Sequence, residues 1–121
     1  IYYKMKNKLE IENLSKEEFE LYFQNCPISK AMTIIGGKWK PIILTRIRMG
    51  VNRFGILQRS IPIISKQMLT AQLRELEESK LINRMVYAEV PPRVEYSITT
   101  NGETVFELLE ALSEWGKLQQ Q

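Results

Sequence analysis

The side chains best suited to reading a nucleic acid lie on one predicted helix, which follows Ser65 and covers residues 66–79. Three leucines at helical spacing predict its buried side: Leu69, Leu73 and Leu76. The opposite side carries Lys66, Gln67, Thr70, Ala71 and Arg74. Glutamine pairs with adenine, lysine and arginine pair with guanine, and the methyl groups of threonine and alanine contact thymine. We therefore predict base readout by Lys66, Gln67, Thr70 and Arg74; the alternative is a solvated face on a scaffold helix.

Basic charge is concentrated in the middle of the chain. The net charge of the 121 residues is +3, but residues 21–74 contain nine lysines or arginines and no carboxylate. A basic face that meets a polyanion explains such a stretch, because nearby carboxylates weaken phosphate contacts. The alternative is a chance run on a solvated surface. Within the stretch we predict phosphate contacts by Lys38 and Arg53, and by Ser65, since a helix N-terminus attracts phosphate.

Two arginines belong to a predicted hairpin whose strands cover residues 82–90 and 94–99. Pro91 and Pro92 exclude a tight two-residue turn, so the tip is expected to project as a loop. Arg93 beside this tip is a candidate for insertion into a narrow minor groove, with a structural salt bridge as the alternative. Arg84 on the first strand either reaches a phosphate or pairs with Glu95 across the hairpin.

Cys26 is the one residue with possible chemistry beyond binding. It is the predicted N-cap of a helix that begins at Pro27, where the helix dipole lowers the pKa of a thiol, and Lys30 one turn along adds to this effect. Cys26 is thus a candidate redox sensor, with a half-buried structural cysteine as the alternative. An enzyme that uses this thiol as nucleophile is disfavoured, because the chain has no histidine. A single cysteine excludes an intrachain disulfide and a thiolate zinc cage. The lack of histidine excludes a histidine metal ligand or general base, so we expect no catalytic residue, metal or cofactor.

The elements that must position these residues follow from local signals. Helices are predicted over residues 13–24, 27–35, 38–49, 54–60 and 66–79, followed by the hairpin and a closing helix that a capping box at Thr100 and Glu103 begins. The predicted core of the third helix is Trp39, Ile42, Ile43 and Ile47, and the closing helix carries an apolar stripe of Val105, Leu108, Leu109, Leu112 and Trp115. This order predicts a mostly helical α+β fold, a winged helix-turn-helix with flanking helices.

Size and composition limit the other possibilities. With 44% hydrophobic and 26% charged residues, the chain is expected to form an ordinary globular protein with its own core. No apolar run approaches the roughly 18 residues of a membrane span, and the N-terminus lacks a signal-peptide core, so we expect no membrane contact and a cytoplasmic location.

Several uninterrupted motifs resemble the HxlR-type family of bacterial transcriptional regulators. They are CPI at 26–28, IGGKW at 35–39, RF at 53–54, IS at 64–65, LTAQLRELEESKL at 69–81, VYAEVPPRVEYS at 86–97 and LSEWG at 112–116. The resemblance implies a homodimer joined by its N- and C-terminal helices, with two wings on a pseudo-palindromic operator. It also implies a response to electrophiles, oxidants or other stress, in several members through the cysteine that Cys26 matches. The chain departs from the pattern in lacking a second cysteine and in having Pro41 in the third helix.

The resemblance, together with the apolar faces, predicts the domain organisation and the partners. Residues 1–25 are expected to form an N-terminal extension with a dimer contact, 26–99 the winged helix-turn-helix, and 100–121 a C-terminal dimerisation helix and tail. The predicted dimer residues are Phe19, Tyr22, Phe23, Leu108, Leu109, Leu112 and Trp115. The predicted function is a dimeric, sequence-specific regulator that binds double-stranded DNA and answers to an oxidant or a small molecule. The alternative is a winged-helix module that binds a protein and never reads DNA, against which the acid-free stretch argues.

Overall fold

The computed structural model describes residues 7–119, so the first six residues of the predicted N-terminal extension lie outside the described part. The chain divides into two compact units, one up to Gly36 and one from Gly37 onward, and each is described here by itself. The predicted boundaries after residues 25 and 99 stay predictions.

Three helices make up the first unit: α1 (Lys8–Glu12), α2 (Lys16–Asn25) and α3 (Pro27–Ile35). Ser15 and Glu18 form the capping box of α2, which begins at Lys16 rather than at the predicted residue 13. Asn7 and Glu10 form a second one, which begins the short helix α1 that sequence analysis did not predict. Cys26 ends α2 and is the N-cap of α3, with Pro27 in the first turn as predicted.

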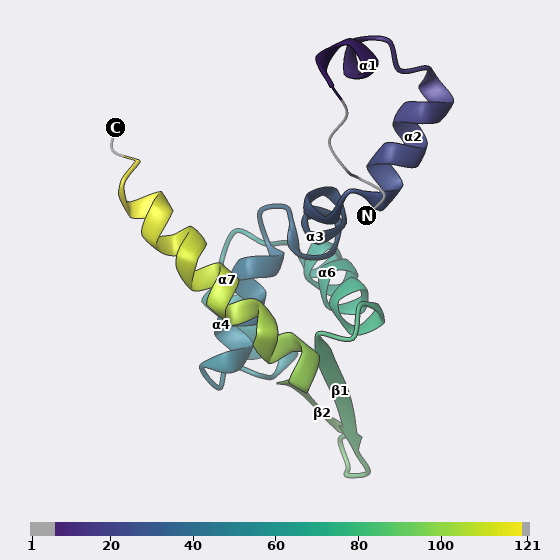
Figure 1. The fold of residues 1–121 in the computed structure, drawn as a ribbon. Coiled ribbons are helices and arrows are strands. Elements are labelled where there is room, and N and C mark those ends of the chain that lie inside the picture. The colour runs from purple at the N-terminus through teal and green to yellow at the C-terminus, as the bar shows by residue number, and fades with distance from the viewer. Residues whose placement is uncertain (1–6, 120–121) are drawn as a thin grey trace. The chain divides into compact units, whose positions relative to one another are not determined.

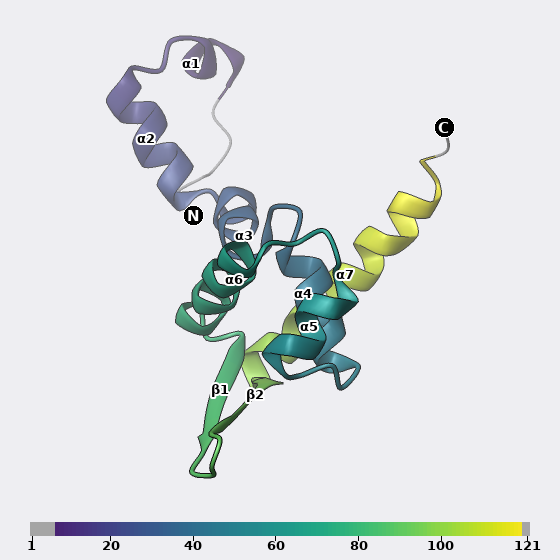
Figure 2. The same cartoon turned by 180° about the vertical axis from the view of Figure 1, so that it is seen from behind.

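The second unit has the predicted order of a winged helix-turn-helix (Figure 1). Its elements are α4 (Lys40–Arg48), α5 (Phe54–Ser60), α6 (Lys66–Glu78), β1 (Ile82–Tyr87), β2 (Arg93–Ile98) and α7 (Thr100–Lys117). The strands pair antiparallel, with Ile82 opposite Ile98 and Tyr87 opposite Arg93. The hairpin projects away from the helices of this unit in both views (Figures 1 and 2).

Every helix of the second unit except α7 contributes aliphatic side chains to one core. Its buried side chains are Ile43, Leu44, Ile47, Leu57, Ile61, Ile64, Leu69, Leu73, Leu76, Leu81, Ile82, Tyr96 and Phe106. The three leucines of α6 are among them, as predicted. The backbone N–H of Tyr96 donates to the carbonyl of Asn52 over 2.9 Å, which attaches β2 to the segment before α5.

Predictions for α4, for both strands and for the start of α7 need correction. In α4, which begins at Lys40 rather than at residue 38, the buried face consists of Lys40, Ile43, Leu44 and Ile47 at helical spacing, so Leu44 is buried and Ile42 is exposed. Pro41 therefore lies in the first turn, where backbone amides have no helical partner, and it does not break the helix. β1 ends at Tyr87 rather than at residue 90, and β2 covers Arg93–Ile98 rather than residues 94–99. Arg93 is therefore the first residue of β2. The N-cap of α7 is Thr99, whose Oγ1 accepts the N–H of Gly102 over 2.8 Å.

The closing helix packs through residues outside its predicted stripe. The buried residues of α7 are Gly102 and Phe106 in its first two turns. A Cβ atom at Gly102 would collide with the carbonyl of Leu81 and lie 2.9 Å from a methyl group of Ile98. Glycine at this position therefore lets the start of α7 approach the hairpin closely, and most of the predicted stripe is left exposed.

Candidate nucleic-acid interface

The exposed side of α6 carries all the residues predicted to read bases. Lys66, Gln67, Thr70 and Arg74 are exposed, and they line a shallow hollow of about 350 Å³ together with Ala71. Ser65 caps the helix by accepting the N–H of Met68 over 3.0 Å. Thr70 donates its hydroxyl to the carbonyl of Lys66 over 2.8 Å, which leaves its methyl group and oxygen lone pairs for other contacts. The helix thus presents cations, an amide and methyl groups from its N-terminal end onward.

The cations of the acid-free stretch fall into two groups. Three of them hold the second unit together: Lys40 pairs with Glu75 at 2.7 Å, Arg48 pairs with Glu103 at 3.2 Å and lies over the Phe106 ring, and Arg46 donates to the carbonyl of Ser60. The ion pairs that Lys40 and Arg48 form with their separate partners join residues far apart in the sequence, so no local sequence signal predicts them.

The other lysines and arginines that the acid-free stretch contributes to the second unit are available to a ligand. Lys38, Arg53, Arg59, Lys66 and Arg74 are exposed, and none of them has an ion pair within residues 7–119. Lys38 lies over the ring of Trp39, with 4.8 Å from its Nζ to the ring centroid. Arg53 is the N-cap residue of α5, so its side chain starts beside a helix N-terminus. The phosphate contacts at Lys38, Arg53 and Ser65 stay predictions.

A polar cleft lies between α6 and the wing. It has a volume of about 420 Å³ and is lined by Phe54, Thr70, Leu73, Arg74, Glu77, Arg84 and Tyr96. Arg84 is exposed and stands opposite Tyr96 in the hairpin, whereas Glu95 stands opposite Met85. The alternative in which Arg84 pairs with Glu95 is therefore wrong. Arg74 and Arg84 instead bring two positive charges to one cleft.

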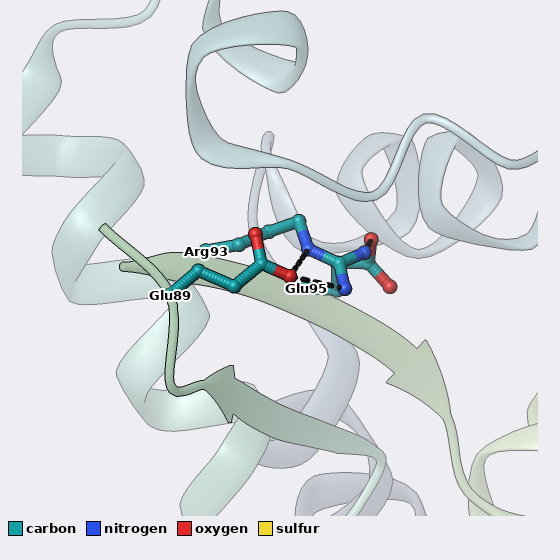
Figure 3. Close-up of polar contacts among 3 residues, drawn as sticks. All are labelled: Glu89, Arg93 and Glu95. Atoms are coloured by element: carbon teal, nitrogen blue, oxygen red, sulfur yellow. Dashed lines mark hydrogen bonds and ion pairs between the residues drawn. The ribbon is translucent and has the colours of Figure 1, made fainter. Parts of the chain in front are cut away.

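Arg93 is held by its own wing, as Figure 3 shows. Glu89 accepts hydrogen bonds from Nε at 3.2 Å and from Nη2 at 2.9 Å, and Glu95 accepts one from Nη1 at 2.6 Å. The guanidinium also lies 3.9 Å from the centroid of the Tyr87 ring. The hydrogen bond to Glu89 is the main cause that raises the pKa of Arg93, with the Glu95 carboxylate adding to it. This is the salt bridge that stood as the alternative to minor-groove insertion, so insertion requires Arg93 to exchange these partners.

Cys26 combines burial with an acidic thiol. Cys26 is 8% exposed. The backbone N–H and the hydroxyl of Ser29 lower the pKa of Cys26, against the opposing effect of burial, and the N–H of Ile28 lowers it further. The predicted contribution of Lys30 is not among the causes. The thiol is therefore more acidic than an ordinary cysteine, for a local reason at the start of α3.

The side chains predicted to form a dimer contact are largely uncovered within each unit. On α2, Phe19 and Phe23 are exposed, with ring centroids 6.0 Å apart, and Tyr22 is half-buried. On α7, Leu108, Leu112 and Trp115 are exposed, and Leu109 is half-buried. Leu109 and Leu112 also line a groove of about 470 Å³ against α4. Leu118, which sequence analysis did not include, extends the exposed apolar surface of this helix region.

Across residues 7–119, no helix combines the length and the apolar character that crossing a membrane requires. The same residues contain no group of three or more histidine, cysteine or acidic side chains arranged to hold a metal ion.

Comparison with known proteins assigns the chain to a family. The sequence profile of the HxlR-like helix-turn-helix family matches residues 34–121. The chain belongs to this family. An HTH-type transcriptional regulator of Methanothermobacter thermautotrophicus is 53% identical to this HxlR-like chain over 93 residues, which are 77% of this chain and 71% of the relative. The regulator YdeP of Bacillus subtilis is 44% identical over 95 residues, 78% of this chain and 74% of the relative.

The fold comparison agrees with the family. The HxlR-like chain is similar to the solved structure of the redox regulator HypR in its oxidized form, with a TM-score of 0.73 and 42% sequence identity. The similarity covers 79% of this chain and 99% of the HypR chain. The winged helix-turn-helix fold and the HxlR resemblance are therefore confirmed. This chain is a helix-turn-helix transcriptional regulator, like the relatives that it matches.

Proposed function

We propose that this HxlR-like chain is a homodimeric regulator that reads a pseudo-palindromic operator in double-stranded DNA, in the cytoplasm. Each α6 enters a major groove, where Lys66, Gln67, Thr70 and Arg74 contact base edges. Lys38, Arg53 and Ser65 contact phosphates, and the wing with Arg84 and Arg93 follows the adjacent backbone or minor groove.

One observation carries this proposal. The leucines of α6 are buried, while Lys66, Gln67 and Arg74 are exposed and neither cation has an ion pair within the described residues. The acidic residues of α6 come only in its C-terminal half, from Glu75 onward, so its N-terminal half is the part that approaches phosphate without repulsion. A module that binds only a protein has no need for this separation.

The exposed apolar faces of α2 and α7 support a symmetric dimer. Monomeric proteins rarely expose a large contiguous face of aromatic and leucine side chains. Such side chains are typical of the centre of an interface. A twofold dimer presents two copies of α6, so the half-sites are expected about one helical turn apart, roughly 34 Å.

The base-reading role is tested with Gln67→Ala and Lys38→Ala. Both variants and the parent protein select binding sites from a pool of random duplexes, and their affinities are then measured against salt. We expect Gln67→Ala to relax base preference at its position, because a bidentate contact discriminates between bases. Lys38→Ala is expected to weaken binding evenly and to flatten the salt slope by about one. Equal loss at all sequences for Gln67→Ala contradicts its role, and a parent protein without any salt slope indicates the protein-binding module instead.

A thiol response through Cys26 is the second part of the proposal. It is supported by the lowered pKa of this thiol and by the similarity to the redox regulator HypR, solved in its oxidized form. The test measures release of the selected duplex after diamide or a quinone, for the parent protein and for Cys26→Ser. Release that persists unchanged in Cys26→Ser contradicts thiol sensing.

A further inference from the structure

The ion pair between Lys40 and Glu75 joins the first turn of α4 to α6. The Lys40 Nζ atom lies 2.7 Å from Oε1 of Glu75. The two side chains differ in environment, since that of Lys40 is 8% exposed and that of Glu75 is 53% exposed. Among residues 7–119, Lys40 is the one charged residue that is buried. A buried ammonium needs its counter-charge, so Lys40 holds the Glu75 carboxylate in one place.

Glu75 occupies a particular side of α6. Glu75 lies one turn after Ala71 on the same side of α6, and Gln67 and Arg74, seven residues apart, lie together beside Ala71, where they line the same hollow. The buried leucines lie on the next side of the helix, and Thr70, Arg74 and Glu77 lie on the far flank, which lines the cleft toward the wing. The flank with Glu75 is thus tied to α4, and the flank with Arg74 faces the wing.

The buried leucines set which side of α6 faces the core, because protein interiors are closely packed. A charge-assisted hydrogen bond at 2.7 Å is directional and short. It fixes a second point, on the flank of α6, and so limits how far the helix can turn about its axis while the leucines stay buried. It also neutralises the carboxylate that follows Arg74 in the sequence.

We propose that the Lys40–Glu75 ion pair is a positioning device, which sets the rotation of α6 and thereby the base preference of Gln67. Lys40 belongs to the basic stretch but contacts no phosphate. This inference rests on the proposed function, since it concerns the same helix in the same groove. Lys40 and Glu75 act on DNA only through the residues whose direction they set.

The test uses Lys40→Met, which keeps the apolar stem and removes the charge. The exposed carboxylate of Glu75 is then solvated by water, so this variant is expected to fold. The double variant Lys40→Met/Glu75→Leu removes both charges and replaces the ion pair by an apolar contact, an exchange that proteins often tolerate. Arg48→Met is the matched control, because it removes another ion pair of α4, the one to Glu103 on α7, and leaves α6 untouched.

Each protein selects sites from a pool of random duplexes, and its affinities for the parent's selected duplex, for single-base-pair changes in it and for an unrelated duplex are measured against salt. A single mismatch costs the parent protein about five- to 150-fold in affinity. In Lys40→Met and in the double variant we expect this preference to fall about fivefold or more at the positions that depend on Gln67. The affinity for the unrelated duplex and the salt slope are expected to stay within about twofold and 0.3 of the parent's values. Arg48→Met is expected to keep the parent's preference.

Each outcome decides a separate claim. Unchanged base preference in the charge-removed variants overturns the positioning role, and so does a salt slope that falls by about one in Lys40→Met, since this indicates a phosphate contact. If both variants are unfolded by circular dichroism, the ion pair is a requirement of the fold and the proposal is likewise overturned. A parent protein that selects no motif from the pool contradicts the proposed function itself, which distinguishes the two failures.

Discussion

The guanidinium of Arg93 donates hydrogen bonds to the carboxylates of Glu89 and Glu95 and lies over the ring of Tyr87. An arginine in this position reaches a phosphate or a minor groove only by giving up two carboxylates. The wing of the free protein is therefore less cationic than its arginine content suggests, and Glu89 competes directly with DNA for Arg93.

Removing the charge of Glu89 should favour DNA. In Glu89→Gln, Arg93 keeps one carboxylate partner, Glu95, and repulsion between the wing and phosphates falls. We expect the affinity for an unrelated duplex to rise about two- to fivefold at low salt. Glu110→Gln on α7 is the charge-matched control and is expected to have a smaller effect. Equal gains in the two variants indicate a net-charge effect and argue against a wing that approaches DNA.

The acidity of Cys26 should be visible in its reaction with an alkylating agent. Because the folded pKa of this thiol is lowered, the thiolate fraction near neutral pH is larger in the folded protein than in the unfolded chain. The pH midpoint of iodoacetamide modification is thus expected below that of the same chain in urea. Ser29→Ala removes the hydroxyl but keeps the backbone N–H, so it should raise the midpoint without restoring the unfolded value. A midpoint that does not move in Ser29→Ala assigns the effect to the backbone alone.

The same shift links Cys26 to stability. A depressed folded pKa means that the thiolate is favoured in the folded state, so this contribution is fully present above the unfolded pKa of the thiol. It is lost as the pH falls through the folded pKa, and at lower pH Cys26 behaves as a neutral buried side chain.

At the scale of elements, α7 depends on one close approach. Gly102 lies against the carbonyl of Leu81 and a methyl group of Ile98, where no side chain fits. Gly116 lies near the other end of the same helix, and a Cβ atom there would meet nothing. The two glycines have opposite consequences for the helix that contains them.

Alanine substitution at these glycines should separate the two situations. Gly102→Ala is expected to lower the free energy of unfolding by about 1 to 3 kcal/mol, because the added methyl group overpacks the contact with the hairpin. Gly116→Ala is expected to raise it by about 0.5 to 1 kcal/mol through helix propensity. Urea denaturation measures both. Stabilisation in Gly102→Ala contradicts the close approach.

Local signals predicted some helix starts and could not predict tertiary contacts. The helices at Pro27 and after Ser65 begin at the predicted residues, since capping depends on neighbours within one turn. The helix expected from residue 13 begins only after its N-cap Ser15. The leucine side of α6 was likewise predictable from its period. The partner of Lys40 was not, because Glu75 lies on another helix and both looked like independent surface charges. Phe106 was missed for a similar reason, since which side of α7 is covered depends on where the hairpin lies.

At the scale of the whole molecule, the exposed apolar side of α7 bears on assembly. Leu112→Glu places a charge in the exposed stripe of this helix without touching its buried residues, Gly102 and Phe106. We expect this variant to sediment as a monomer at concentrations where the parent protein is a dimer, because a charge is disfavoured in an interface core. Its affinity for a two-half-site duplex should fall at least about tenfold. Met49→Glu, at the exposed end of α4, is the control. A Leu112→Glu variant that keeps the parent's sedimentation coefficient excludes this face from the dimer contact.

The two tryptophans of the chain have different surroundings. Trp39 is half-buried beneath the ammonium of Lys38, and Trp115 on α7 is 63% exposed. An indole that leaves water for an apolar surface emits at shorter wavelength, so the emission of Trp115 should shift to the blue as subunits associate, while that of Trp39 stays constant. With Trp39→Phe, the unlabelled protein would then report its own association by fluorescence, through a dilution series without any attached dye.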